Sequence, residues 1–257
     1  MAERGVAIIS GGSSGIGAAV AADLAAAGLA VVITYNSNAA GAETVAMACR
    51  KQGVEAVCVK ADVADDDDCR RVVSTAIDSF GRLDVLINNA GMTRFADATD
   101  FDAVSAEDFD RIFRVNVTGS YQLARAATSG LRQTGGAIVN ISSHSGFSGM
   151  GSSIAYAASK GALNTLTLGL ARSLAPDIRV NAVCPGFVDT DWMAKKLDTA
   201  ELADFKNKAA AISPLQRLVS AAEVAEAVHW FALGGASITG QLLVIDGGTH
   251  LTVSTPV

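Results

Sequence analysis

Short apolar runs separated by longer alanine-rich stretches make up most of the chain. The runs lie at 6–10, 30–35, 56–60, 85–88, 137–141, 179–183 and 242–245. Most are apolar at every position, which is typical of strands whose two faces are both covered by helices. The alternation predicts an α/β fold with a doubly wound, mostly parallel seven-stranded sheet, in a single domain over 1–257.

Turn residues mark where the predicted helices end. Gly28, Gly53 and Gly81 follow helical stretches and can adopt the left-handed conformation that often terminates a helix. We find no linker, repeat or low-complexity segment. The longest region without a predicted strand runs from 187 to about 232, and a substrate lid is expected at about 187–215.

Composition and charge narrow the functional classes. The chain has 257 residues, 50% of them hydrophobic, which is enough for one sizeable core. No segment approaches the ~20 unbroken apolar residues of a membrane span, and the first residues lack the length and cleavage site of a signal peptide. We therefore expect a cytoplasmic protein with no membrane partner. The net charge of −6 argues against nucleic acid as a partner, because no basic stripe is present to neutralise phosphates.

Residues that commonly bind metals are not grouped in this sequence. Cys49, Cys58, Cys69 and Cys184 form no CxxC pair, and the three histidines are scattered. We predict neither a metal site nor a disulfide framework. The acidic run at 65–68 is interpreted as a helix start, where carboxylates interact favourably with the helix dipole.

A glycine-rich loop lies between the first predicted strand and an alanine-rich helix. It reads Ser10-Gly11-Gly12-Ser13-Ser14-Gly15-Ile16-Gly17. Glycines let the backbone turn sharply and approach a pyrophosphate, and the helix N-terminus supplies amide donors. A plain tight turn is the alternative, but the strand–loop–helix context favours dinucleotide binding in a Rossmann fold.

Polar segments also follow the third and fourth predicted strands. Asp62 and Val63 come after the third strand, where an aspartate could reach an adenine amino group. The sequence Asn88-Asn89-Ala90-Gly91 ends the fourth strand, where small residues leave room for a ribose. Taken alone, this second segment is better explained as a polar turn.

Tyr156 and Lys160 lie four residues apart in a predicted helix, which places them on one face. A lysine ammonium beside a phenol stabilises the phenolate, so the pKa of Tyr156 is expected to fall from ~10 towards neutrality. Such a tyrosine can exchange a proton with a carbonyl or alcohol oxygen. The same spacing recurs by chance on many helices, so it needs support from other residues.

Together these motifs resemble the short-chain dehydrogenase/reductase family in its compact single-domain form, over nearly the whole chain from 6 to 248. The family pattern TGxxxGxG is kept at the three glycines of the loop, with Ser10 in place of threonine, which retains the hydroxyl. NNAG stands at 88–91, YxxxK at 156–160 and a PG pair at 185–186. The general likeness is to 3-oxoacyl-carrier-protein reductases and to sugar, steroid or small-ketone dehydrogenases.

The resemblance implies four catalytic residues: Asn116, Ser143, Tyr156 and Lys160. Tyr156 would pass the proton to or from the substrate oxygen, and Lys160 would hold the nicotinamide ribose and lower the tyrosine pKa. Ser143 would orient the carbonyl oxygen, and Asn116 would hold a water that links Lys160 to solvent. The implied function is an NAD(P)-dependent oxidoreductase that moves hydride between nicotinamide and a small-molecule carbonyl or secondary alcohol.

The expected cofactor contacts come from the glycine loop, the ends of several strands, the Tyr156 helix and the segment after the sixth strand. They are Ser10, Gly11, Ser13, Ser14, Gly15, Ile16, Gly17, Tyr35, Asn36, Ser37, Asp62, Val63, Asn89, Ala90, Gly91, Tyr156, Lys160, Pro185, Gly186, Val188 and Thr190.

The end of the second strand carries no carboxylate. Tyr35 stands where NAD-selective dehydrogenases place an acidic residue that binds the ribose hydroxyls and repels a 2′-phosphate. Asn36 and Ser37 offer neutral donors, but neither Asn36 nor Ser14 supplies the basic group of many NADP-type members. We expect NADP(H) to be preferred about tenfold, without exclusion of NAD(H).

A substrate wall is expected near the nicotinamide. Trp192 and Met193 suggest an apolar lid, with ordinary packing of a surface helix as the alternative. The wall is assigned to Thr93, Arg94, His144, Phe147, Met150 and 187–193. An acidic carrier protein would prefer basic docking groups, and the candidates for that role are Arg94, Arg125 and Arg132.

The helix predicted at about 153–175 carries little charge apart from Lys160 and Arg172, so it is expected to be buried on more than one side. Ala158, Leu166 and Leu170 are candidates for contact with a second subunit. The family usually assembles through this helix and the preceding one, so a homotetramer or homodimer is expected.

Two other functions fit parts of the sequence. A non-catalytic dinucleotide sensor or scaffold could use the same fold, but such proteins typically lose a catalytic residue. A sugar-nucleotide epimerase of the extended branch is disfavoured by the short C-terminal region and the glycine spacing.

Overall fold

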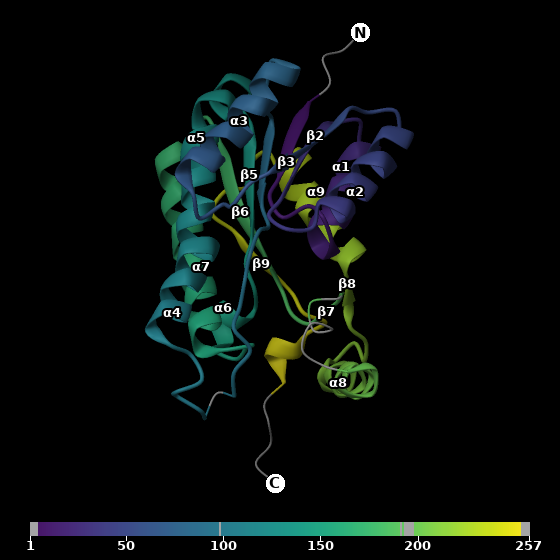
Figure 1. The fold of residues 1–257 in the computed structure, drawn as a ribbon, viewed down its shortest axis with the longest axis vertical. Helices are drawn as coiled ribbons and strands as arrows, with labels where there is room; N and C mark the ends of the chain where they lie inside the picture. The colour runs from purple at the N-terminus through teal and green to yellow at the C-terminus, as the bar shows by residue number, and fades with distance from the viewer. Residues whose placement is uncertain (1–4, 98, 191, 193–197, 253–257) are drawn as a thin grey trace.

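The computed structural model describes residues 5–97, 99–190, 192 and 198–252. A seven-stranded sheet at its centre has the spatial order β3-β2-β1-β4-β5-β6-β9, and every neighbouring pair is parallel (Figure 1). The strands are β1 (Val6–Ile9), β2 (Ala30–Tyr35), β3 (Ala56–Lys60), β4 (Val85–Asn88), β5 (Ala137–Ile141), β6 (Arg179–Pro185) and β9 (Leu242–Ile245). The predicted doubly wound α/β fold is confirmed.

The strand boundaries differ from the prediction at two places. β1 ends at Ile9 because Ser10 already belongs to the glycine loop. β6 continues to Pro185 because its pairing with β9 extends to the pair Pro185 and Ile245.

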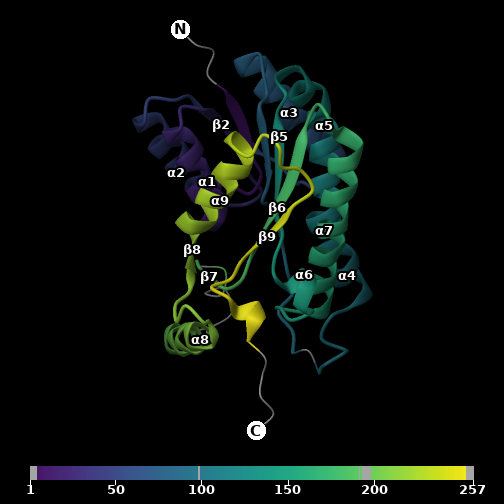
Figure 2. The same ribbon diagram turned by 180° about the vertical axis from the view of Figure 1, so that it is seen from behind.

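Helices cover both faces of the sheet, as Figures 1 and 2 show from opposite sides. One face carries α1 (Gly15–Ala26), α2 (Ala39–Lys51) and α9 (Ala221–Leu233). The other carries α3 (Asp66–Phe80), α5 (Gly119–Thr134) and α7 (Ile154–Leu174).

The core is divided between these two layers by the alternation of strand side chains. Along β1, Ala7 and Ile9 pack against α1, α2 and α9, whereas Val6 and Ile8 pack towards α3, α5 and α7. Both sets are almost fully buried. The continuous apolarity of the strands therefore has a direct cause, since each face meets its own helix layer.

The helix ends follow the predicted turn chemistry. Gly28, Gly53 and Gly81 all have positive φ, and the Gly81 amide donates to Ile77 O at 2.8 Å to close α3. At the start of α3, the Asp65 carboxylate accepts the amides of the second and third residues that follow it. The acidic run is thus the N-terminus of a helix, as predicted.

The remaining elements gather where the parallel strands end, at the bottom of Figure 1. They are α4 (Ala106–Phe113), the π-helix η1 (Arg114–Thr118), α6 (Ser145–Ser148), β7 (Val188–Asp189), α8 (Thr199–Ile212), β8 (Val219–Ser220) and the 3₁₀ helix η3 (Thr249–Leu251). The region expected to contain no strand holds β7 and β8, which pair in parallel. A strand of two residues is too short to produce a readable sequence pattern.

No helix within the described part of the chain is both long and apolar enough to cross a membrane.

Candidate active site

The glycine loop and the end of β4 form one hydrogen-bonded unit. Ser10 Oγ accepts the amides of Asn89 at 2.9 Å and Ala90 at 3.0 Å, and donates to Ile87 O at 3.2 Å. In return, Asn89 Nδ2 donates to the carbonyls of Ser10 and Gly11, both at 2.9 Å. The NNAG segment is therefore more than a polar turn, because its amides hold the loop at the position where the strand order reverses.

Close packing explains the glycines of this loop. A Cβ on Gly17 would lie 2.5 Å from both Asn89 Nδ2 and Gly11 O, and one on Gly12 would lie 2.9 Å from Ile33 Cγ2. Gly11 and Gly15 have positive φ. No larger residue fits these positions without displacing the loop.

The N-terminus of α1 is suited to a phosphate. Ser14 occupies the N-cap position but makes no side-chain cap hydrogen bond. The first amides of this helix are therefore not satisfied by a cap, and they carry the positive end of the dipole. The loop and helix thus fit the pyrophosphate of a dinucleotide.

The second and third strands border this loop. Thr34 holds it through Oγ1, which accepts Gly11 N at 3.2 Å, and through its carbonyl, which accepts Gly12 N at 3.0 Å. Beyond β2, Tyr35 is half-buried, whereas Asn36 and Ser37 are exposed. No carboxylate stands among them.

Asp62 and Val63 are fixed by their own turn. Asp62 Oδ1 accepts Ala64 N at 3.0 Å, and its amide donates to Asp68 Oδ2 at 2.8 Å. Val63 is buried against Gly119, where a Cβ would lie 2.8 Å from the valine side chain.

Ser143, in the loop after β5, and Tyr156, in the first turn of α7, are brought together. The Tyr156 amide donates to Ser153 Oγ at 3.2 Å at the start of α7, which fixes the first turn of the helix. A hydrogen bond joins the Tyr156 and Ser143 side chains. Ser143 Oγ also donates to Ser145 Oγ at 3.0 Å and accepts Ser145 N at 3.1 Å. Ser145, which the sequence reasoning missed, therefore orients the Ser143 hydroxyl.

The electrostatics of Tyr156 and Lys160 differ from the prediction. Burial raises the pKa of Tyr156 to about 12, although the hydrogen bond from Ser143 lowers it in part. Burial also lowers the pKa of Lys160 to about 8, with a small opposing effect of Cys184. Lys160 Nζ donates to Ile141 O at 2.8 Å and lies 5.6 Å from the centroid of the tyrosine ring. The expected fall of the tyrosine pKa is wrong for this structure, because desolvation of the phenol outweighs an ammonium held elsewhere.

Asn116 links three parts of the site from within η1. Its Oδ1 accepts Met92 N at 2.8 Å, and its Nδ2 donates to Met92 O at 3.0 Å and Ser159 Oγ at 2.9 Å. Ser159 in turn donates to the Tyr156 carbonyl at 2.7 Å. A Cβ on Gly91 would lie 3.5 Å from Asn116 Oδ1 and 3.8 Å from Lys160 Nζ. Asn116 and Lys160 therefore flank the same glycine, and π-helical turns of this kind often occur at functional sites.

The end of β6 and the residues that follow it form another side of the candidate site. Pro185 O accepts His144 N at 2.9 Å and Ser143 Oγ at 3.4 Å. A Cβ on Gly15 would lie 3.6 Å from Thr190 Cγ2, so Thr190 lies beside the glycine loop. Val188 lies in β7, whereas the predicted lid residues 191 and 193 fall outside the described residues.

His144 has a partner that the sequence did not reveal. Its ring is almost fully buried, and Nδ1 lies 3.5 Å from Asp246 Oδ2. Asp246 also accepts the amides of Gly248 and His250 and the His250 ring. Burial disfavours ionisation of Asp246, but the hydrogen bonds from His250 and Gly248 outweigh it and lower the pKa. The His144 ring also contacts Phe187, at a centroid distance of 6.3 Å, so it belongs to the wall of the site.

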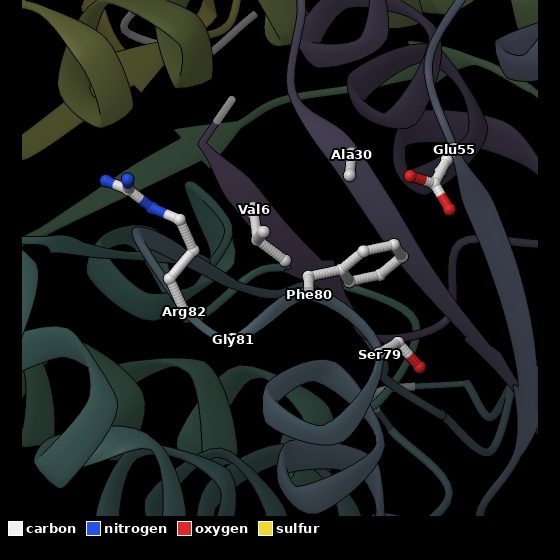
Figure 3. Close-up of a pocket in the computed structure, with 7 residues that line it drawn as sticks. All are labelled: Val6, Ala30, Glu55, Ser79, Phe80, Gly81 and Arg82. Atoms are coloured by element: carbon white, nitrogen blue, oxygen red, sulfur yellow. The ribbon is translucent and has the colours of Figure 1, made fainter. Parts of the chain in front are cut away.

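A separate pocket of about 370 Å³ lies at the opposite edge of the sheet (Figure 3). It is lined by Val6, Ala30, Glu55, Ser79, Phe80, Gly81 and Arg82. None of these is a predicted site residue, and β1 and β2 begin here rather than end, so the pocket is distinct from the candidate active site.

Comparison with known proteins decides the family. The family model described as enoyl-(acyl carrier protein) reductase matches residues 11–250. A protein named as ketoacyl reductase 2 of the granaticin polyketide synthase, from Streptomyces violaceoruber, is 40% identical and covers 97% of each chain. The chain belongs to the short-chain dehydrogenase/reductase family.

Other members of the family agree. The 3-oxoacyl-[acyl-carrier-protein] reductase of Synechocystis is 36% identical, over 95% of this chain and 96% of that protein. A crystal structure of a short-chain dehydrogenase/reductase from Burkholderia xenovorans matches with a TM-score of 0.91 at 40% identity, over 98% of this chain and 100% of the other. This short-chain dehydrogenase/reductase is an oxidoreductase that uses a nicotinamide dinucleotide, as predicted, and nothing supports the non-catalytic alternative.

Proposed function

We propose that this enzyme interconverts a carbonyl and a secondary alcohol through Tyr156, Lys160, Ser143 and Asn116. The observation that carries the proposal is the convergence of these residues, since Ser143 binds the Tyr156 side chain while Asn116 and Lys160 flank Gly91. They come from the loop after β5, from η1 and from α7, so chance spacing along one helix does not account for the arrangement.

Tyr156 acts as the proton donor when a carbonyl is reduced. Because the pKa of its phenol is raised to about 12, the side chain carries its proton at neutral pH. Ser143 presents a hydroxyl to the same oxygen, and Ser145 orients that hydroxyl before the substrate arrives.

Lys160 and Asn116 support this proton transfer. The pKa of Lys160, about 8, leaves the ammonium largely protonated at neutral pH, so its Nζ can hold a ribose hydroxyl of the dinucleotide beside Tyr156. Asn116 anchors the backbone of Met92 and lies beside Lys160 across Gly91, where a water can connect the ammonium to solvent.

The nicotinamide dinucleotide supplies or accepts the hydride when bound. The glycine loop and the uncapped start of α1 would hold its pyrophosphate. Asp62 and Val63 would lie at the adenine, and 89–91 at the ribose. The residues that would hold the nicotinamide end are Pro185, Gly186, Val188 and Thr190, the last of which lies near Gly15.

The proposal also includes the cofactor preference and the lid. NADP(H) is favoured modestly over NAD(H), because Tyr35, Asn36 and Ser37 offer no carboxylate to repel a 2′-phosphate. The lid spans about 187–215 and includes α8. Its packing on the site is supported by the Phe187 ring, which lies 6.3 Å from the His144 ring of the site wall and 5.1 Å from the Phe205 ring of α8, measured between centroids.

The enzyme is proposed to assemble as a homotetramer or homodimer through α7 and α5, in the cytoplasm. The residues of α7 suited to a subunit contact differ in part from those predicted. Ala158 is exposed and Leu166 is half-buried, but Leu170 packs against the core, whereas Leu168 is exposed. The four free cysteine thiols suit a reducing compartment.

The proposed reaction is tested by Tyr156→Phe. The variant should keep the fold and cofactor affinity, because the ring remains, while turnover of a panel of ketones with NADPH falls by about 10²–10⁴-fold. Ser152→Ala, one residue before the helix cap Ser153, serves as the matched hydroxyl deletion nearby and should retain most activity. A Tyr156→Phe variant that keeps more than about a tenth of the wild-type rate contradicts the assignment.

A further inference from the structure

The three arginines proposed from the sequence as docking groups for an acidic carrier protein are all ion-paired within the chain. Arg125 binds Asp66, Arg132 Nε lies 3.4 Å from Asp177 Oδ2, and Arg94 Nε lies 3.9 Å from Asp108 Oδ2. A carrier carboxylate would have to compete with these internal partners, so the arginines contribute little net attraction.

The remaining charge around the mouth of the site does not favour an acidic partner. The segment 94–114 borders the loop before α7, since Ala96 N donates to Ser152 O at 2.9 Å. It carries six carboxylates against three arginines. Such an excess repels an acidic protein during its approach.

The basic side chains in and next to the proposed lid are also ion-paired within the chain. Lys206 Nζ lies 2.5 Å from Asp189 Oδ1, Lys208 Nζ lies 2.6 Å from Asp204 Oδ2, and Arg217 binds Glu223. Arg111 and Arg114 are exposed and have no ion pair within the described residues, but they lie in the segment 94–114, where carboxylates outnumber arginines two to one.

Apolar side chains are exposed at the same end of the molecule. Phe147 and Met150 lie at and just beyond α6 and are 54% and 63% exposed. A Cβ on Gly151 would lie 3.4 Å from Tyr156 Cδ1, which places this apolar rim beside the proton donor. Leu215, between α8 and β8, is 62% exposed, and its amide donates to Gly247 O at 3.1 Å.

These exposed apolar side chains lie on separate elements, and a bound ligand or partner would cover their exposed area. Covering their exposed apolar area removes it from water and stabilises the complex. Grouped apolar residues of this kind mark a binding surface more often than isolated ones do.

We propose that the substrate is a free, uncharged, apolar ketone and not an acyl group carried on an acidic carrier protein. The inference rests on the proposed function and names its substrate class. The excess of carboxylates in 94–114, the acidic rim, repels the carrier protein. The apolar rim formed by Phe147 and Met150 binds the free ketone beside Tyr156.

A matched set of three substrates tests the proposal with NADPH: α-tetralone, the acetoacetyl thioester of N-acetylcysteamine, and the same acetoacetyl group on an acyl carrier protein. The carrier should raise kcat/KM over the small thioester by no more than about twofold, and α-tetralone should at least equal the thioester. The rate with α-tetralone should not change between about 0.05 and 0.5 M salt, because no charge attraction is involved. A carrier advantage of about tenfold or more that falls with salt would overturn the proposal.

Charge-reversal variants on α4 test whether the acidic rim repels the carrier protein. Glu107→Lys with Asp110→Lys, both exposed on α4, should raise kcat/KM for the carrier-bound substrate and leave α-tetralone unchanged. Glu226→Lys, exposed on α9 across the sheet, makes a like change of charge away from the mouth and should alter neither. If the α4 reversal does not change the carrier-bound rate, the proposed exclusion is wrong.

The apolar rim has its own test. Phe147→Ser and Met150→Ser should each raise KM for α-tetralone by about fivefold or more while the NADPH affinity stays constant. Met47→Ser, which removes an equally exposed methionine from α2, is the control. Unchanged KM values in both rim variants would refute apolar recognition.

The failure of this inference is distinguishable from that of the proposed function. Turnover of the carrier-bound ketone without turnover of α-tetralone leaves carbonyl reduction standing and overturns the substrate class. Consumption of NADPH with none of the three ketones overturns both.

Discussion

Replacing Lys160 by methionine should stabilise the fold while abolishing catalysis. Lys160 is 4% exposed, and burial lowers the pKa of its ammonium from 10.5 to about 8. At about 1.36 kcal/mol per pH unit, keeping this group charged at neutral pH costs roughly 3 kcal/mol. Methionine has a similar length and no charge, so the variant avoids this cost.

Part of the gain is lost with the hydrogen bond that Lys160 Nζ donates to Ile141 O at 2.8 Å. Leaving a buried acceptor without this donor costs about 1–3 kcal/mol. The net increase in the free energy of unfolding is therefore about 0–2 kcal/mol, equivalent to a rise in Tm of up to roughly 8 °C for a chain of this size.

The pH dependence of the free energy of unfolding shows whether the buried charge of Lys160 causes the difference between the two proteins. Because the folded pKa lies below the unfolded one, the unfolded chain binds the additional proton between about 8 and 10.5. Wild-type stability therefore rises with pH across that window, and the advantage of the methionine variant shrinks. All other groups titrate alike in the two proteins, so their difference isolates Lys160.

The assay is urea unfolding of the cofactor-free proteins at equal concentration, at neutral pH and near pH ~10. Lys208→Met, which removes a lysine with a side chain 73% exposed, should change stability by less than about 0.5 kcal/mol. A Lys160→Met variant that is less stable at neutral pH, or whose advantage persists at high pH, refutes the reasoning.

Three further outcomes are expected. The wild-type kcat/KM for NADPH should exceed that for NADH by about tenfold, or roughly 1.4 kcal/mol, and Tyr35→Asp should reverse the order; a wild-type preference for NADH shows that absent repulsion is insufficient. Light scattering should show a dimer or tetramer that Leu168→Asp weakens and Met47→Asp does not, whereas a wild-type monomer at micromolar concentration contradicts the assembly. Gly17→Val should abolish NADPH binding, measured by fluorescence titration, because its Cβ would lie 2.5 Å from Gly11 O; retained affinity would show that the loop tolerates displacement.

Much of the fold could be predicted because its signals are local. The apolar runs gave all seven strands of the sheet, with small errors at Ser10 and Pro185, since strands buried on both faces are apolar at every position. Helix ends at Gly81 and Asp65 followed from backbone conformation and capping, which depend on neighbouring residues. The glycine loop was recognisable for the same reason.

The candidate site depended on contacts between distant segments. Spacing pointed to Asn116, Ser143, Tyr156 and Lys160, but it contained no information about Ser145 as the partner of Ser143. The two short strands β7 and β8 also escaped prediction, because their pairing is a tertiary contact that leaves almost no pattern in two residues.

By itself the sequence determined the order of polar and apolar segments along the chain, the dinucleotide loop and the spacing of the reactive residues. Only the tertiary structure decided the degree of burial and the partner of each charge. Burial reversed the expected pKa shift of Tyr156, and ion pairs neutralised Arg125 and Arg132. It also placed Leu170, partly buried, against the core and Leu168 at the surface. The physical reason is that hydrophobic periodicity is set by neighbours along the chain, whereas desolvation and ion pairing depend on atoms brought close only by packing.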